Sequence, residues 1–133
     1  MKAEIIKMPK AIGPQLEAAI ERGVLAATLI VEGQVKLDTP VDTGRLKGSI
    51  GHRVSGRTAE IFTNVEYAPY VEYGTGIHAE GGGGRKTPWV YQDWNGNWHY
   101  THGQLPRPFM RNGIDMTRKD ATRAFWTEVR KAL

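Results

Sequence analysis

The stretch from Pro14 to about Leu37 constrains the fold of this chain more than any other. Gly13-Pro14 precedes it, and proline is favoured in the first turn of a helix. Thr39-Pro40 follows it, and proline cannot continue a helix. We therefore predict one helix of roughly 35 Å at 1.5 Å per residue. Apolar residues recur through it in steps of three and four, the spacing of one helix face: Leu16, Ile20, Val24, Ala27, Val31 and Val35.

Two leucines fall on the opposite side of this predicted helix. At 100° per residue, Leu25 and Leu29 lie among charged residues. Scattered surface leucines are common in soluble proteins. The alternative is a second apolar face that another subunit covers, which makes both leucines candidate interface residues.

Length and composition indicate a single domain over residues 1–133, at roughly 100–200 residues per domain. The chain has no cysteine, which excludes disulfides and thiolate metal sites. Its longest apolar run, Leu29-Ile30-Val31, is far shorter than the ~20 residues of a membrane span, so no membrane partner is expected. The net charge of +4 permits contact with nucleic acid or an acidic partner but requires neither.

Two segments have the composition of flexible chain. Residues 1–13 mix short apolar and basic runs and predict an extended, flexible arm. Residues 77–88 contain Gly81-Gly82-Gly83-Gly84, whose ordering is entropically costly, and predict a flexible loop. Arg85 and Lys86 follow these glycines and form a basic tip that can order against a partner, so both are candidate interface residues. A nucleotide site is rejected, because Arg85 interrupts the Gly-Lys junction that a phosphate-binding loop requires.

Two β-hairpins are predicted. The first joins residues 49–55 to 58–65 around Ser55-Gly56-Arg57, and its second strand alternates apolar with polar residues. The second joins residues 89–93 to 97–102 around Asn95-Gly96, the favoured dipeptide of a type I′ turn. That turn would place Tyr91 opposite Tyr100 and Trp89 opposite His102. One face would then gather four aromatic residues for packing on the domain or on a neighbour, with base stacking as the alternative: Trp89, Tyr91, Trp98 and Tyr100.

The segment from Tyr67 to Gly76 has two interpretations. Its tyrosines, at positions 67, 70 and 73, suit an ordered loop that is buried on one side and wet on the other. The same spacing of three also fits one turn of a core helix. We treat the tyrosines as candidate interface residues: Tyr67, Tyr70 and Tyr73.

Arginine and lysine side chains supply the remaining candidates. Arg45 carries a planar charged group suited to a carboxylate or phosphate, although a local salt bridge is the simpler role. A last helix is predicted over residues 108–131, with an apolar face that includes Met110, Ile114 and Phe125. Its opposite face is either solvated or in contact with DNA phosphates, and its candidate residues are Lys119, Arg123 and Arg130.

No arrangement of residues indicates catalysis. The chain has four histidines, and His99 and His102 are three apart on a predicted strand, so they point to opposite faces. No histidine–acid spacing matches a metal motif. The sequence therefore predicts no enzyme activity, no catalytic residue, no metal and no cofactor.

Three separated blocks lie between and beside the predicted helices. They are Pro40-Val41-Asp42-Thr43-Gly44-Arg45-Leu46-Lys47-Gly48-Ser49-Ile50, then Tyr67-Ala68-Pro69-Tyr70-Val71-Glu72-Tyr73-Gly74-Thr75, then Pro106-Arg107-Pro108-Phe109-Met110. Together with the helices around them, these blocks resemble the small tail-component family of long-tailed bacteriophages and prophages. The resemblance covers about residues 14–133. It implies an α+β fold in which two helices, one N-terminal and one C-terminal, pack on an antiparallel β-sheet.

The resemblance also implies a non-enzymatic role in tail completion or head–tail joining. Members act as assembly parts at the head–tail interface, as a ring that is often hexameric. The implied partners are sibling copies, the head–tail connector and the tail-tube protein, with passing contact to DNA. The implied location is the virion, and the host cytoplasm during assembly. The alternative is a DNA-binding module that uses the basic last helix and the aromatic hairpin.

Overall fold

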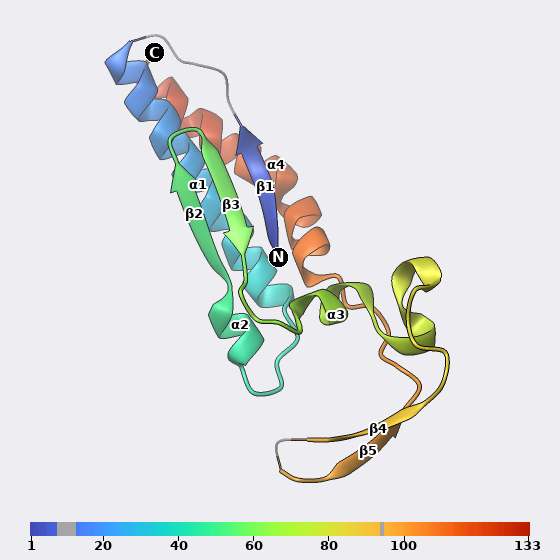
Figure 1. The fold of residues 1–133 in the computed structure, drawn as a ribbon. Coiled ribbons are helices and arrows are strands. Elements are labelled where there is room, and N and C mark those ends of the chain that lie inside the picture. Colours follow the sequence, from blue (N-terminus) through green and yellow to red (C-terminus); the bar gives the residue numbers. More distant parts are fainter. Residues whose placement is uncertain (8–12, 94) are drawn as a thin grey trace. The chain divides into compact units, whose positions relative to one another are not determined.

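The computed structural model describes residues 1–7, 13–93 and 95–133 and combines helices with antiparallel strands (Figure 1). The predicted α+β class is therefore confirmed. The chain divides into two compact units: the first contains Met1–Val65 and Phe109–Leu133, and the second contains Glu66–Pro108. That the two units act as one domain over residues 1–133 stays a prediction.

The predicted long helix is present as α1, Pro14–Asp38. Proline occupies its first turn, and Thr39 ends it in an extended conformation. The Thr39 hydroxyl donates to the carbonyl oxygen of Val35 at 2.6 Å, which satisfies an acceptor that the helix end would leave open. The predicted apolar face is buried, apart from the half-buried Leu16: Ile20, Val24, Ala27, Val31 and Val35.

The last helix, α4, spans Phe109–Arg130 and lies antiparallel to α1 (Figure 1). Two glycines bring the helices close together. A Cβ atom on Gly23 of α1 would lie 2.8 Å from the Phe125 ring, and one on Gly113 of α4 would lie 2.6 Å from Val35. Glycine inside a helix costs about 0.5–1 kcal/mol relative to alanine. Close approach of the two helices explains its presence at both positions.

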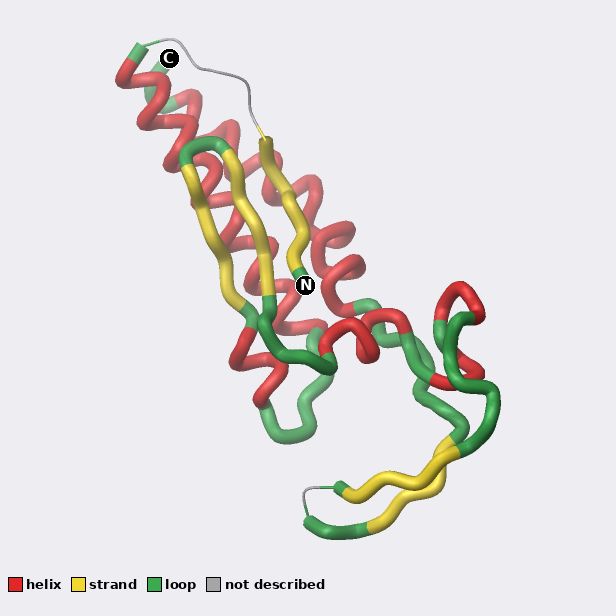
Figure 2. The backbone as a smooth tube through the Cα atoms, viewed as in Figure 1, coloured by secondary structure: helices red, strands yellow, loops and turns green. Residues whose placement is uncertain are grey.

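A three-stranded antiparallel sheet packs against α1 (Figure 2). Its order is β1 (Lys2–Lys7), β3 (Thr58–Phe62), β2 (Gly51–Ser55). The first predicted hairpin is thus confirmed with shorter strands, and the pair Ser55↔Thr58 closes it around Gly56-Arg57. The apolar alternation is also confirmed, because four residues in or just after β3 are buried: Ala59, Ile61, Thr63 and Val65.

The flexible arm expected at the N-terminus is wrong for Lys2–Lys7, which is the paired strand β1. The register of β1 against β3 shifts between Glu4 and Ile6, so Ile5 is the extra residue of a bulge. In a regular strand, consecutive side chains point to opposite faces. The bulge lets both Ile5 and Ile6 pack against the core, which anchors the strand. The rest of the predicted arm, at residues 8–12, lies outside the described residues.

The short helix α2, Arg45–Ser49, leads from α1 into β2. Leu46 and Ile50 are both 4% exposed, as their spacing of four predicts. Gly44 immediately precedes α2, and its φ of 85° lies in the left-handed region that favours glycine.

The second unit contains α3 (Ala68–Tyr73), two 3-10 turns and a hairpin. The turns are η1 (Gly76–His78) and η2 (Glu80–Gly82), and the hairpin strands are β4 (Trp89–Gln92) and β5 (Trp98–Thr101). The segment expected to be a flexible loop, residues 77–88, thus has defined turns. Its flexibility stays a prediction.

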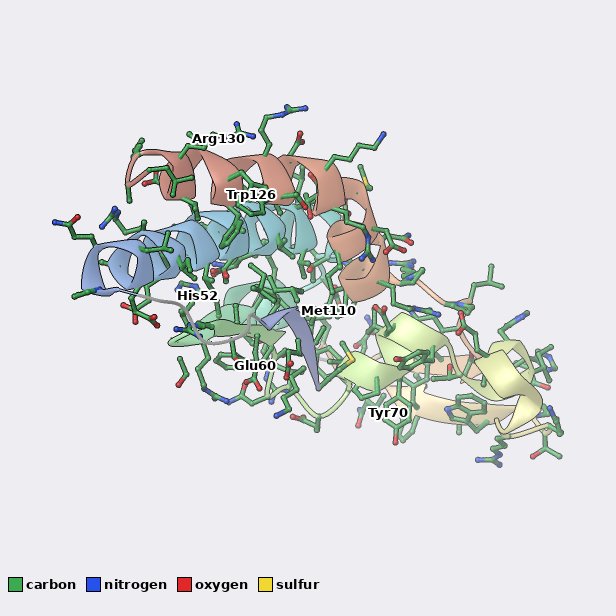
Figure 3. All side chains as sticks on the ribbon, turned by 90° about the horizontal axis from the view of Figure 1, so that it is seen from above. His52, Glu60, Tyr70, Met110, Trp126 and Arg130 are labelled. Carbon is green, nitrogen blue, oxygen red and sulfur yellow. The ribbon has the colours of Figure 1, made fainter. Side chains whose placement is uncertain are left out.

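A charge cluster joins α1 to β2. Glu32, only 8% exposed, lies 2.8 Å from Lys36 on the same helix and contacts the ring of His52 on β2, which is labelled in Figure 3. Burial raises the pKa of Glu32, but hydrogen bonds from Lys36 and His52 outweigh burial and leave the pKa below its usual 4.5. The ionised carboxylate therefore stabilises the packing of α1 on the sheet.

We expect alanine substitution at Gly23 and Gly113, where α1 meets α4, to change stability in the opposite direction from alanine substitution at Gly33. Gly23→Ala or Gly113→Ala forces α1 and α4 apart, so each should lower the free energy of unfolding by about 1–3 kcal/mol. Gly33 is also inside α1, but a Cβ atom on it would meet nothing within 4 Å. Gly33→Ala should therefore raise stability by about 0.5–1 kcal/mol. Urea unfolding followed by circular dichroism measures all three, and equal effects at Gly33 and Gly113 would contradict the packing.

Glu32 should make stability fall in acid. Because its folded pKa is depressed, its contribution is fully present above pH 4.5 and is lost as the pH falls through the lower folded value. Unfolding free energies measured from pH 7 to pH 3 should show a gap between wild type and Glu32→Gln. That gap should be constant above pH 4.5 and close below it. Glu21→Gln, an exposed position on α1, is the control. A gap that stays open at pH 3 would contradict the assignment.

Candidate functional site

The described residues present no candidate metal centre. No group of three or more histidine or acidic side chains in these ranges could hold a metal ion. His99 and His102 point to opposite faces of the hairpin as predicted, since His99 stacks on Tyr91 and His102 contacts Tyr100 edge-on. Within the described ranges, no helix is long and apolar enough to cross a membrane. The features that remain are exposed surfaces.

The outer face of α1 is apolar and open. Leu25 is 42% exposed and Leu29 is 49% exposed, and Ile30, about 100° around the helix from Leu29, is 36% exposed. The inner face of the same helix is occupied by α4 and the sheet. The leucines therefore lie on the outside of the first unit, where the helical spacing predicts them. Ile30 was missed, because it lies next to the buried Val31 and the spacing alone did not separate the two.

The tyrosine segment is a helix, but its tyrosines do not form a core. Tyr70, labelled in Figure 3, is 61% exposed, Tyr73 is 43% exposed, and Tyr67 is half-buried. Pro69 lies in the first turn of α3, and Gly74 ends the helix with φ of 82°. A Cβ atom on Gly74 would lie 2.9 Å from the carbonyl oxygens of His78 and Gln104, so only glycine fits there. Of the two interpretations, helix geometry is right and burial of the tyrosines is wrong.

The basic candidates of the first and second units are exposed and bonded locally. Arg45 begins α2, and its backbone N–H donates to the Thr43 hydroxyl at 3.2 Å. The Arg85 guanidinium lies 5.6 Å from the centre of the Trp89 ring and donates to Thr87 at 3.0 Å. The Lys86 ammonium donates to the carbonyl oxygen of Gly82 at 2.9 Å. These contacts fold Arg85 and Lys86 back on their own unit.

The second hairpin is present, but its predicted register is wrong by one residue. Asp93 and Asn97 are the last pair, with the Asp93 N–H donating to the Asn97 carbonyl oxygen at 2.8 Å. The Asp93 carboxylate accepts the N–H groups of Asn95 and Asn97 at 2.9 and 2.8 Å. These bonds, with Gly96 at φ of 83°, favour a longer loop over the two-residue type I′ turn that Asn95-Gly96 predicts.

The corrected register separates the aromatic residues. Trp89 faces Thr101 and Tyr91 faces His99, while Val90 faces Tyr100 and Gln92 faces Trp98. A shift of one residue moves a side chain to the other face of a strand. Tyr91 and His99 therefore stack on one face, 5.1 Å between ring centres, and Trp98 and Tyr100 lie on the other. The predicted single aromatic face is wrong.

Both faces of this hairpin are open. Four of its large apolar side chains have exposures of 46–68%: Val90, Tyr91, Trp98 and Tyr100. A two-stranded hairpin alone is marginally stable in water.

The base of the hairpin is held by close backbone contacts at Gly76, where the sequence allows a turn with positive φ, and at Gly103. The Thr75 N–H donates to the Gln104 carbonyl oxygen at 2.9 Å, and the Ile77 N–H donates to that of His102 at 3.0 Å. A Cβ on Gly76 would collide with the His102 carbonyl, and one on Gly103 with that of Thr75. The sequence signal for this close approach was one glycine before the hairpin and one after it, Gly76 and Gly103.

The basic residues of α4 are exposed as predicted, but acids lie among them. Lys119, Arg123 and Arg130, the last labelled in Figure 3, all face solvent. The Arg123 guanidinium lies 3.5 Å from Asp120, one turn away. Arg118 likewise pairs with Asp115 at 2.8 Å. Local acids reduce the positive potential that DNA phosphates need.

One comparison with known proteins identifies a match. The family model described as "Bacteriophage HK97-gp10, putative tail-component" matches residues 3–74, more than half of the 133 residues. The matched range contains the outer face of α1, Arg45 and the tyrosines, and it stops before the second hairpin and α4. No curated protein and no solved structure matches the chain.

We expect Gly76→Ala and Gly103→Ala to disrupt the hairpin base. Each variant combines a positive-φ backbone with a backbone collision, so each should lower the free energy of unfolding of the second unit by more than ~1 kcal/mol. Tryptophan fluorescence and limited proteolysis between residues 74 and 104 measure the loss. Gly83→Ala is the control, because Gly83 has φ of −84° and open space around it. Proteolysis of Gly103→Ala at the rate of Gly83→Ala would contradict the close approach.

Proposed function

Because the chain belongs to the HK97-gp10-like family of bacteriophage tail components, we propose that it is a non-enzymatic assembly protein that joins head to tail as a ring. Family membership makes it a phage tail-related structural protein of the virion, and it confirms the family resemblance that the sequence predicted. We propose that its specific role in the particle is tail completion or head–tail joining. The proposed partners are sibling copies, the head–tail connector and the tail-tube protein, assembled in the host cytoplasm.

The observation that carries the proposal is the apolar surface left open by each unit. On the first unit, Leu25 and Leu29 lie four residues apart on one exposed face of α1. On the second, the hairpin exposes aromatic residues on both faces. Contiguous exposed apolar surface marks protein–protein contact. A subunit with two such surfaces can meet two neighbours, which is what a ring requires.

The polar candidates fit the edges of such contacts. Arg45, Arg85 and Lys86 are exposed, and charged groups at the rim of an interface set specificity and encounter rate more than affinity. Tyr70 and Tyr73 offer large rings with polar tips, which are enriched at interfaces. We propose that these residues, with Tyr67, contact sibling copies or adjoining tail proteins.

DNA binding through α4 is the alternative function. It is favoured by the exposure of Lys119, Arg123 and Arg130 on one helix. It is weakened by Asp115 and Asp120, which pair with arginines of the same helix. Contact with DNA that passes through a ring is compatible with both functions.

A phage that carries a stop codon in this gene tests the proposal. Its lysates should contain filled heads and separate tails in electron micrographs, and the wild-type gene supplied from a plasmid should restore plaques. Leu25→Asp/Leu29→Asp should fail to restore them, because charges on the outer face of α1 block packing. Leu37→Asp should restore them, since Leu37 is 71% exposed and lies about 120° around the helix from Leu25.

Two outcomes of this experiment decide between the functions. Intact, infectious particles without the gene would refute head–tail joining. The variant Lys119→Glu/Arg123→Glu/Arg130→Glu should restore plaques if the protein works through its apolar surfaces. Loss of plaques with that variant, together with normal restoration by Leu25→Asp/Leu29→Asp, would favour the DNA-binding function.

A further inference from the structure

The first unit carries an open apolar groove of about 430 Å³. It lies among β1, α1 and α4, and Trp126, labelled in Figure 3, is 44% exposed within it. Pockets of about 300–1,000 Å³ with mostly apolar walls are typical of sites that hold large apolar groups. The side chains that give this groove its apolar character are Ile5, Ile6, Ile114, Ala121, Phe125 and Trp126.

The second unit carries a surface of matching character. In the observed register, Val90, Trp98 and Tyr100 lie on one face of the hairpin, and they are 60%, 68% and 68% exposed. Tyr100 is directly opposite Val90, so the three form one patch. The other face is already partly used, because Tyr91 stacks on His99 and His99 bonds to Asp93 at 2.7 Å.

We propose that the Val90/Trp98/Tyr100 face of one copy packs into the β1–α1–α4 groove of the next copy. This inference rests on the proposed ring and names the contact that builds it. The groove and the hairpin face are different surfaces, so the contact is head-to-tail. A head-to-tail contact closes into a ring when its repeated rotation adds up to a full turn without a rise along the axis.

The hairpin face supplies part of the area that such a contact needs. Large aromatic side chains bury about 150–250 Å² each, so Trp98 and Tyr100 supply roughly 300–500 Å². A stable interface buries about 800 Å² per partner. Val90 and the hairpin backbone add to the aromatic contribution. One hairpin therefore supplies a large share of a subunit interface.

The groove recognises side chains rather than adding a strand. β1 is an edge of its sheet, but the bulge at Ile5 interrupts the regular spacing of its backbone groups. Bulges protect edges from pairing with foreign strands. Arg118 also lines the groove and is 70% exposed, and it pairs with Asp115 at 2.8 Å. The match between the groove and the hairpin face is therefore apolar, with aliphatic and aromatic side chains on both surfaces.

Cross-linking of single-cysteine variants tests the contact directly. The chain has no cysteine of its own, so each variant carries one reactive thiol. Tyr100→Cys is mixed with Thr122→Cys, which lies in the groove wall and is exposed, and treated with a short bis-maleimide. We expect a covalent heterodimer in several-fold higher yield than from Tyr100→Cys mixed with Ser55→Cys. Ser55 is an exposed position on the opposite edge strand, β2.

A mixing experiment separates contact between copies from contact within one copy. Trp98→Ala/Tyr100→Ala removes the hairpin side chains, and Ala121→Trp fills the groove. Circular dichroism and thermal melts first establish that both variants are folded. Each variant alone should sediment as a monomer. A mixture should form a 1:1 dimer that does not grow, because one intact hairpin meets one intact groove.

The outcomes distinguish this inference from the proposed function. Equal cross-linking at Thr122 and Ser55, or no dimer in the mixture, overturns the hairpin–groove contact. If the wild-type chain still forms rings or is present at the head–tail junction, the proposed function survives that result. If the wild-type chain also stays monomeric and is absent from particles, both the hairpin–groove contact and the proposed function are refuted.

Discussion

The close approach of α1 and α4 at Gly23 and Gly113 is the contact on which the first unit depends. These glycines lie against Phe125 and Val35, and the absence of a Cβ atom at each lets two long helices approach closely. The same face of α1 then also receives β2 and β3. Because the inner face is filled in this way, the apolar residues on the outer face of α1 cannot be covered by these elements. The exposed leucines are therefore a consequence of how the core is built.

The second unit follows a different principle. Its stability comes from backbone bonds and glycine contacts where residues 74–77 meet residues 102–104, and its hairpin contributes exposed aromatic side chains. A hairpin with no apolar layer beneath it gains from association with other protein. Both units thus present surface that a neighbour can complete. A tail component that works as part of a larger particle needs this property, whereas an enzyme needs a closed pocket with placed polar groups.

Sequence patterns predicted those elements whose signals are local. The spacing of apolar residues located α1 and α4, and alternation located β3 and its buried residues. The errors arise where a side-chain bond or a distant segment overrides the local pattern. Asn95-Gly96 favours a two-residue turn, but bonds from the Asp93 carboxylate select a longer loop and move every aromatic residue of the hairpin by one pairing step. The sequence predicts a flexible arm for Lys2–Lys7, because the strand that pairs with it lies more than fifty residues away and gives no local signal. The roles of Gly23, Gly76, Gly103 and Gly113 depend on the segment that each one touches, which no local pattern gives.

The central claim is that other copies and adjoining tail proteins cover the apolar surface that a single copy exposes. A cryo-electron microscopy map of the head–tail junction of the virion tests this most directly. We predict a ring of this chain in which Leu25, Leu29 and the Trp98/Tyr100 face all contact neighbouring chains. A map in which the chain is absent from the junction, or in which those side chains face solvent, would contradict the account.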